Sequence, residues 1–382
     1  MATHPSAPEP SLPDTIRDRS EFLKSYVVVA EEKVAEPFRG LTADGNVIPG
    51  LFPIQATGHS TAPVVEAARV LLSELSSEQR ATAQYPIDSD HWRRWSNIHP
   101  PLLRHGVCLE QMSSAQRQRV YDLLAAGLSA AGYDAAIGVM RLNETVGEMT
   151  GRFDEYGDQR YWVSIFGEPS ADQPWGWQVD GHHLNLNYFV LGDQVVLSPL
   201  FLGSEPVFAE AGKYAGTRVF QAEEERGLRL LRTLSNEQRG LAIIGDELPH
   251  DVFGTAFRDN LTLSPQGICY DELDPRQQAG LRSVIETYVH RLRPGHAEVR
   301  MDEVANHYSE TRFAWIGETS EVGVFYYRVQ SPVILLEFDH QRGVAFRGTP
   351  VSRNHIHTVL RTPNGNDYGR DLLRQHHERF QH

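Results

Sequence analysis

The stretch Trp175-Gly-Trp-Gln-Val-Asp-Gly-His-His-Leu-Asn-Leu-Asn-Tyr-Phe-Val190 joins aromatic and β-branched residues to a block of polar ones. This composition predicts extended structure, in which successive side chains point to opposite faces. In a single strand, one face carries Trp177, Val179, His183, Asn185 and Asn187, and the other carries Gln178, Asp180, His182, Leu184 and Leu186. A buried sheet normally avoids a row of His and Asn side chains. The row therefore predicts a ligand site, a metal site or a matched polar network.

Further strands and helices flank this stretch. Strands are predicted at 161–166, at 195–197 after a Gly192-Asp193 turn, and at 313–316, 322–329 and 333–338. Helices are predicted at 64–72, 116–131, 222–234, 237–244, 274–290 and 371–382. Because helices and strands come in blocks, the order predicts an α+β fold with mixed or antiparallel sheets and packed helices.

One local signature occurs four times. Ser76-Ser-Glu-Gln79, Ser113-Ser-Ala-Gln116, Ser235-Asn-Glu-Gln238 and Asp274-Pro-Arg-Gln277 each predict a capping box at the start of a helix. The spacing between the four is irregular, so we interpret them as four independently capped helices without a solenoid repeat.

Composition limits the class of protein. The 382 residues include 36 Lys and Arg against 50 Asp and Glu, a net charge of −14, so no nucleic-acid or membrane partner is expected. Two cysteines and a polar N-terminus without a signal-like apolar core predict a cytoplasmic location. Residues 1–18 are expected to form a flexible arm and residues 19–382 one large domain, in which 60–135 could be a helical subdomain. No phosphate-binding or nucleophile-elbow motif is present.

A second polar segment lies near the C-terminus. His355-Ile-His357 on a strand would point both imidazoles to one side, which is the spacing of two ligands that bind one metal ion. Glu337 or Asp367 could complete the ligand set or orient an imidazole. A packed core pair of histidines is the alternative interpretation.

Other residues could take part in chemistry. Glu168 and Asp367 are candidates for a base, and Arg361, like Arg152 and Arg160, could clamp a carboxylate. Asn185 and Asn187 are candidates for cofactor binding. For the arginines, a salt bridge is the alternative.

Three motifs carry a family resemblance: Phe166-Gly-Glu-Pro-Ser170, then Trp175-Gly-Trp-x-x-x-Gly-His-His-Leu-x-x-Asn187, then Ser198-Pro-Leu-Phe-x-Gly203. Together with Asn354-His-Ile-His-Thr358 and Asp367-Tyr-Gly369, they resemble the bacterial family catalogued as domain of unknown function 3500. The resemblance covers the chain from about residue 64 to the tail. It implies that the two histidine segments meet in one pocket. Many relatives begin with an export signal, which this N-terminus lacks.

The leading hypothesis is a metal-dependent enzyme, hydrolytic or oxidative, that acts on a small polar molecule. Its predicted metal ligands are His183, His355 and His357, with His182 and Glu337 as alternates. The metal could be Zn, Fe, Cu or Mn, because imidazole binds all of them. Two alternatives stay open: a non-catalytic binding or scaffold protein with a buried His/Asn network, and a metal-free enzyme in which His182 or His183 acts beside Glu168.

Overall fold

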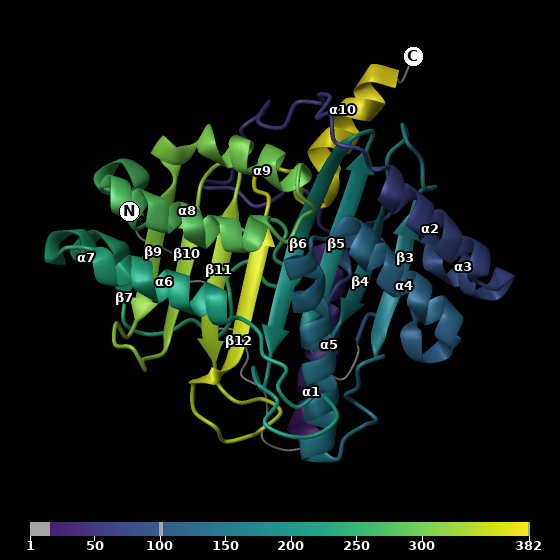
Figure 1. The fold of residues 1–382 in the computed structure, drawn as a ribbon, viewed down its shortest axis with the longest axis horizontal. Coiled ribbons are helices and arrows are strands. Elements are labelled where there is room, and N and C mark those ends of the chain that lie inside the picture. Colours follow the sequence, from purple (N-terminus) through teal and green to yellow (C-terminus); the bar gives the residue numbers. More distant parts are fainter. Residues whose placement is uncertain (1–15, 99–101, 381–382) are drawn as a thin grey trace.

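The computed structural model describes residues 16–98 and 102–380, and it confirms the α+β class (Figure 1). A twelve-stranded sheet forms the centre, with the strand order β1-β3-β4-β5-β6-β12-β11-β10-β9-β7; β2 pairs with β3 and β8 with β9. All pairs are antiparallel except β1 with β3 and β7 with β9. Among the described helices, none combines the length and apolar character needed to cross a bilayer.

The sheet consists of two halves that repeat one order of elements. The first half comprises α2 (Ala62–Glu74), α3 (Ser77–Ala83), β1 (Gln84–Tyr85), β2 (Val107–Cys108), α4 (Ser114–Gly127), α5 (Ala130–Thr150), β3 (Tyr161–Phe166), β4 (Trp175–Gly181), β5 (Leu184–Leu191) and β6 (Gln194–Ser204). The second half comprises α6 (Gln221–Thr233), α7 (Asn236–Ala242), β7 (Ile243–Gly245), β8 (Ile268–Cys269), α8 (Pro275–Val289), α9 (His296–Ala305), β9 (Arg312–Gly317), β10 (Phe325–Gln330), β11 (Leu335–Gln341) and β12 (Ser352–Arg361). Helices α1 (Ile16–Ala35) and α10 (Arg370–Phe380) lie outside the repeat.

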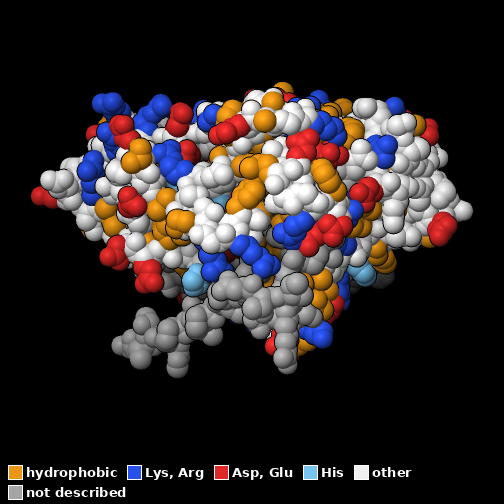
Figure 2. Space-filling model, turned by 90° about the horizontal axis from the view of Figure 1, so that it is seen from below, with side chains coloured by type: hydrophobic (Ala, Val, Ile, Leu, Met, Phe, Trp, Pro, Cys, Tyr) orange, Lys and Arg blue, Asp and Glu red, His pale blue; other side chains and the backbone are white. Residues whose placement is uncertain are grey.

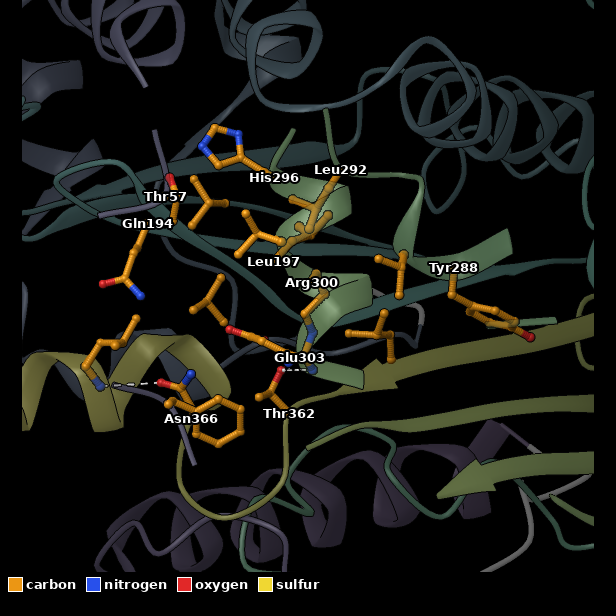
Figure 3. A pocket seen from close by; sticks show the side chains of 17 residues that line it. Thr57, Gln194, Leu197, Tyr288, Leu292, His296, Arg300, Glu303, Thr362 and Asn366 are labelled. Atoms are coloured by element: carbon orange, nitrogen blue, oxygen red, sulfur yellow. Dashed lines mark hydrogen bonds and ion pairs between the residues drawn. The ribbon is translucent and has the colours of Figure 1, made fainter. Parts of the chain in front are cut away.

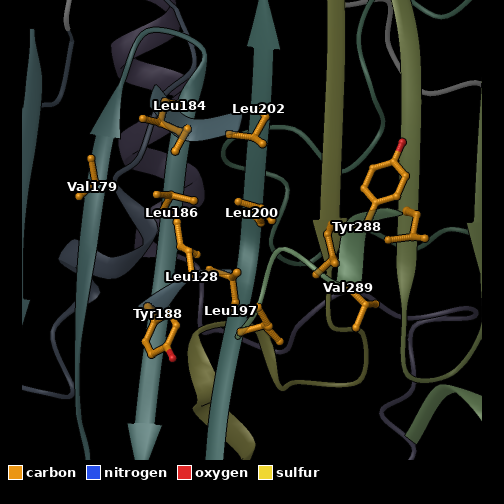
Figure 4. Close-up of a cluster of buried hydrophobic side chains, with 14 of the residues drawn as sticks. Leu128, Val179, Leu184, Leu186, Tyr188, Leu197, Leu200, Leu202, Tyr288 and Val289 are labelled. Carbon is orange, nitrogen blue, oxygen red and sulfur yellow. The ribbon is translucent and has the colours of Figure 1, made fainter. Parts of the chain in front are cut away.

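The halves meet where β6 pairs with β12 in the middle of the sheet. Helices α2 to α9 cover one face of the sheet in Figure 1. Their apolar side chains form one buried core with strand residues such as Leu186, Leu200 and Leu360. Figure 4 shows this face, where Leu128, which follows α4, lies among the leucines of β5 and β6, and Tyr288 and Val289 of α8 lie to the right of them. Because residues of both halves share this core, burial of their apolar surface stabilises the two halves together.

The opposite face is covered by α1 and by the long loops. A smaller apolar cluster there joins Ala30 and Val34 of α1 to Trp95, Phe201 and Val359. Phe201 and Val359 are neighbours across β6 and β12. Their immediate neighbours along both strands face the helices, as the two-residue alternation of a strand requires. Helix α1 begins at Ile16, within the last residues of the arm expected at 1–18, and residues 1–15 lie outside the described part of the chain.

All four predicted capping boxes are present, but the prediction that they are independent is wrong. The side-chain amide of Gln79 donates to Gln116 and that of Gln116 donates to Gln79, and each also donates to the backbone carbonyl two residues before the other's cap, Gln111 and Glu74 respectively. Gln238 and Gln277 make the same exchange in the second half. The capping boxes are therefore two equivalent pairs, one in each half.

The prediction of a single strand at 175–190 is also wrong. The chain turns at His182-His183, and β4 and β5 pair as a hairpin. Because of this turn, the side chains after it point to the opposite faces from those predicted for a single strand. Gln178 lies opposite Asn187, and Asp180 lies opposite Asn185. The polar residues share one face, and Trp177, Val179, Leu186 and Tyr188 share the face toward the helices.

Candidate metal centre

Three histidines from distant parts of the chain converge at one end of the central strand pair. His183 occupies the turn between β4 and β5 with a left-handed backbone (φ +62°), which is uncommon for a residue other than glycine. His355 and His357 are two apart on β12, so their side chains point to the same face. Hydrogen bonds hold the turn in place, since the backbone N–H of His183 donates to Asn97 and the N–H of Gly203 donates to the carbonyl of His183. All three imidazoles are buried.

The three Nε2 atoms form a nearly equilateral triangle. They are 3.1 Å apart between His355 and His357, 3.2 Å between His357 and His183, and 3.3 Å between His355 and His183. Ligand atoms at about 2.1 Å from a metal lie roughly 3.4 Å apart in a tetrahedral site and roughly 3.0 Å apart at neighbouring octahedral positions. The triangle fits one face of a metal coordination sphere, and the three side chains together form the candidate metal-binding group in the described part of the chain.

Hydrogen bonds at Nδ1 of His355 and His357 indicate where these two rings carry a proton. Nδ1 of His355 lies 2.6 Å from the backbone carbonyl of Arg342, which can only accept, so this nitrogen carries the proton. Nδ1 of His357 lies 2.7 Å from Oδ1 of Asp251. Burial, together with nearby His357, lowers the pKa of His355 to about 3, so this ring is neutral. His355 therefore turns the lone pair of its Nε2 toward the other two rings, and His357 does the same in the tautomer that donates from Nδ1 to Asp251.

A carboxylate lies behind each of the two rings, and one of them, Asp251, orients its ring by a hydrogen bond. Burial would raise the pKa of Asp251, but the neighbouring His357 and hydrogen bonds from the Val252 N–H and the Thr255 hydroxyl bring it below its ordinary value. Asp251 is therefore ionised and accepts from His357, which is the arrangement that orients metal-bound imidazoles. Glu205 lies 3.6 Å from Nδ1 of His355. Burial raises its pKa, while the N–H groups of residues 344–346 stabilise its charge.

Gly203 allows the rings to approach each other. It lies on β6 directly opposite His357. A Cβ atom at this position would be 2.8 Å from Cδ2 of His357 and 3.0 Å from Cδ2 of His183. Only a residue without a side chain leaves room for both imidazoles.

A cavity of about 590 Å³ opens from the triad toward α1. Its walls include His183, His355 and His357, the inner side of α1 around Tyr26, and the loop around Phe257. The volume lies in the range of small-molecule sites. The end of the molecule at which β6 finishes is seen in Figure 2, where acidic and basic side chains alternate with apolar ones on the described surface. The triad thus has protein on one side and a space for a small molecule on the other, as catalytic metal sites have.

A second cavity at the other end of β6 and β12 is much smaller. Figure 3 shows its wall, in which Gln194 and Leu197 of β6 lie near His296 of α9. Arg300 there pairs with Glu303 and donates to Thr362. Its volume of about 30 Å³ has room for one or two water molecules.

Two predicted alternate ligands have other partners. His182 lies next to His183 in the turn, with the two rings stacked at 3.9 Å between centroids, and its Nδ1 is 2.8 Å from Asn143 of α5. Glu337 is fully buried and accepts from the N–H groups of Phe253 and Gly254 and from the hydroxyl of Tyr326. Glu337 thereby anchors the loop that carries Asp251.

The predicted catalytic residues lie away from the triad. Glu168 follows β3 and is exposed, at the opposite end of β4 from His183, roughly 20 Å along the strand. Arg361 forms buried ion pairs with Asp367 and Asp259, 2.8 and 2.7 Å long, and this network is a structural one. The structure does not bring Glu168, Asp367 or Arg361 to the histidine triad. Arg152 and Arg160 pair with nearby glutamates.

The two predicted cofactor-binding asparagines lie in the sheet behind the triad. Asn187 accepts from Gln178 and donates to the carbonyl of Pro199. Both polar side-chain atoms of Asn185 are buried without a partner in the described part of the chain. Neither residue lines the large cavity.

Sequence reasoning missed Asp251, Glu205 and the carbonyl of Arg342. Asp251 stands in Pro249-His-Asp-Val252, and no spacing pattern connects it with a histidine about a hundred residues later. Gly203 belonged to a quoted motif, but its role depends on the pairing of β6 with β12. A family alignment of co-varying positions would be the signal that could find these partners.

Together, fold and site define an α+β protein with a three-histidine candidate metal centre at the junction of two similar halves. The chain belongs to the family described as a protein of unknown function (DUF3500), whose model matches residues 57–370. The family membership predicted from the sequence is therefore confirmed, whereas a bacterial source stays a prediction. No curated protein and no solved structure matches the chain. The family match begins after α1, although α1 forms a wall of the large cavity.

Proposed function

We propose that this protein is a metal-dependent enzyme in which His183, His355 and His357 bind one metal ion and a small molecule reacts in the adjoining cavity. The observation that carries the proposal is the meeting of three Nε2 atoms within 3.3 Å, two of them with protons fixed on the opposite nitrogen. With protons on Nδ1 toward the Arg342 carbonyl and Asp251, His355 and His357 each leave Nε2 available to bind a metal ion.

The chain's own groups supply binding and orientation. Asp251 and the carbonyl of Arg342 hold two rings in the ligand tautomer, and Glu337 fixes the loop that positions Asp251. The remaining coordination positions would face the cavity, where a substrate or water can reach them. A divalent ion held there would supply Lewis-acid activation of water or substrate, or redox chemistry if it is iron or copper. Zinc, manganese, iron and copper all suit three imidazoles, so both the hydrolytic and the oxidative reaction remain in the proposal.

The test is metal analysis of protein purified without a histidine tag, followed by reconstitution with Co²⁺, whose absorption reports coordination by nitrogen ligands. We expect one bound ion per chain, and loss of binding in His183→Ala, His355→Ala and His357→Ala. Two matched control variants should still bind one ion per chain. His182→Phe replaces the ring next to His183 that contacts Asn143 of α5, and His377→Ala removes a histidine from α10.

Two outcomes would argue against the proposal. One is a wild-type protein that folds but binds no ion on reconstitution, which would favour the non-catalytic polar network. The other is an activity that survives chelators and follows one pKa near that of imidazole, which would favour metal-free acid–base catalysis.

A further inference from the structure

The charged side chains in the wall of the large cavity almost all have partners. Lys33 pairs with Glu36 and Arg93 pairs with Asp259, and Nδ1 of His357 lies 2.7 Å from Asp251. Glu205 accepts hydrogen bonds from backbone N–H groups of the 344–346 segment. Such pairs leave little net charge to attract a ligand.

Arg342 differs from these residues. It lines the cavity and is half-buried, and in the described part of the chain its guanidinium takes part in no hydrogen bond or ion pair. Its backbone is fixed beside the metal centre, because its carbonyl accepts from His355 and Glu205 holds the residues that follow it. A guanidinium offers up to five N–H donors in a planar fork that matches a carboxylate. An unpaired arginine held beside a cavity is therefore a ready anion-binding group.

The rest of the cavity wall is chiefly apolar. It includes Phe22, Tyr26, Val29, Ala256, Phe257 and Leu261. Tyr26 and Phe257 pack edge to face, with ring centroids 5.7 Å apart. Arg93 donates to the carbonyls of Lys33 and Val34, so α1 is held in place over the cavity. A bound molecule would thus meet apolar surface along most of its length.

We propose that the cavity binds an organic carboxylate with an apolar body, whose carboxylate pairs with Arg342 and whose body packs against α1 and the loop at residues 256–261. This inference names the substrate class of the proposed enzyme and rests on that proposal for the reaction itself. The apolar walls exclude inorganic anions as the preferred ligand, because burial of apolar surface provides much of the binding free energy in such a cavity.

The experiment is calorimetric titration with three probes that share one chain and differ in headgroup: decanoate, decanol and decylamine. Wild-type protein should bind decanoate at least tenfold more tightly than either of the other two. Arg342→Gln should weaken decanoate binding at least tenfold and leave decanol binding unchanged, and Arg342→Lys should retain part of the preference. Arg379→Gln, which removes the same charge from an exposed position on α10, is the matched control and should bind like wild type.

Three results would each overturn the inference. The wild-type protein could bind decanoate and decanol equally or bind neither, or Arg342→Gln could bind decanoate as tightly as wild type. Titration with Co²⁺ on the same preparations separates it from the proposed function. Co²⁺ binding without decanoate binding contradicts the carboxylate site alone. Arg342-dependent decanoate binding without Co²⁺ binding supports the carboxylate site and contradicts the metal-dependent enzyme.

Discussion

At position 203 the chain has room for a hydrogen atom and nothing larger. Gly203→Ala would place a methyl group 2.8 Å from the ring of His357 and 3.0 Å from that of His183, so one or both rings must move. Because a metal site tolerates little displacement of its ligands, we expect at least a tenfold loss of Co²⁺ affinity with the fold retained. Competition with a chelator measures the affinity, and circular dichroism checks the fold.

Gly240→Ala is the matched control for this substitution. Gly240 lies in helix α7, and a Cβ there would meet nothing within 4 Å. The control should leave metal binding unchanged and stabilise the protein by up to about 1 kcal/mol, because alanine favours the helix. Wild-type Co²⁺ affinity in Gly203→Ala would mean that the imidazoles are not held as closely as the structure indicates.

His105 gives a prediction of pH dependence away from the metal centre. Burial, reinforced by nearby His91, lowers the pKa of His105 to about 3 from its ordinary value of 6.5. Below pH 6.5 the unfolded chain therefore binds a proton that the folded chain does not, and this contribution to stability is lost as the pH falls toward 3. Between pH 8 and pH 5 the loss is about 2 kcal/mol.

His105→Leu should remove that part of the pH dependence. Urea unfolding of both proteins at pH 8 and pH 5 measures it, and the variant should lose about 2 kcal/mol less than wild type between the two values. Equal losses in the two proteins would show that His105 is protonated in the folded state at pH 5.

At the scale of elements, the capping boxes interact in pairs, whereas the sequence predicted four independent caps. Gln277 accepts at its own cap and donates to Gln238 and to the carbonyl of Thr233, and it is buried. Gln116 makes the equivalent contacts but is more exposed.

Gln277→Ala should therefore destabilise the protein by about 2–3 kcal/mol, and Gln116→Ala by only about 1 kcal/mol, because water replaces lost hydrogen bonds at the exposed pair. The free energies of unfolding from urea titrations check both values. An equal cost at the two positions would show that burial does not distinguish the two pairs.

At the scale of the molecule, the candidate metal centre connects the two halves. His183 belongs to the first half and His355 and His357 to the second, and all lie beside the β6–β12 junction. An ion that binds only when both halves are assembled stabilises the folded chain by mass action.

We expect Co²⁺ at a free concentration of a hundred times its Kd to raise the free energy of unfolding by about 2.7 kcal/mol. A chelator should reverse the gain, and His355→Ala should show none. Thermal and urea unfolding with and without the ion measure it. If the wild-type midpoint does not respond to a bound ion, the ion binds the unfolded chain equally well.

The turn at His182-His183 shows where local patterns stop being sufficient. Strand composition at 175–190 is a property of neighbouring residues, and it was predicted correctly as extended structure. The chain reversal within it was not, because no glycine or asparagine marks the left-handed position that His183 adopts. As a result the predicted faces of Asn185 and Asn187 relative to Trp177 and Val179 were wrong, although the polar residues do share a face.

By itself the sequence determined the α+β class, the capping boxes, the hairpin at Gly192-Asp193 and the common facing of His355 and His357, because each depends on residues within a few positions of one another. Only the tertiary structure decided that His183 joins them, that Asp251 and Gly203 support the rings, and that Glu168 and Arg361 lie elsewhere. Those relations depend on strand order and register across the sheet. Order and register follow from how the whole chain buries its apolar surface, and no short stretch of sequence records that outcome.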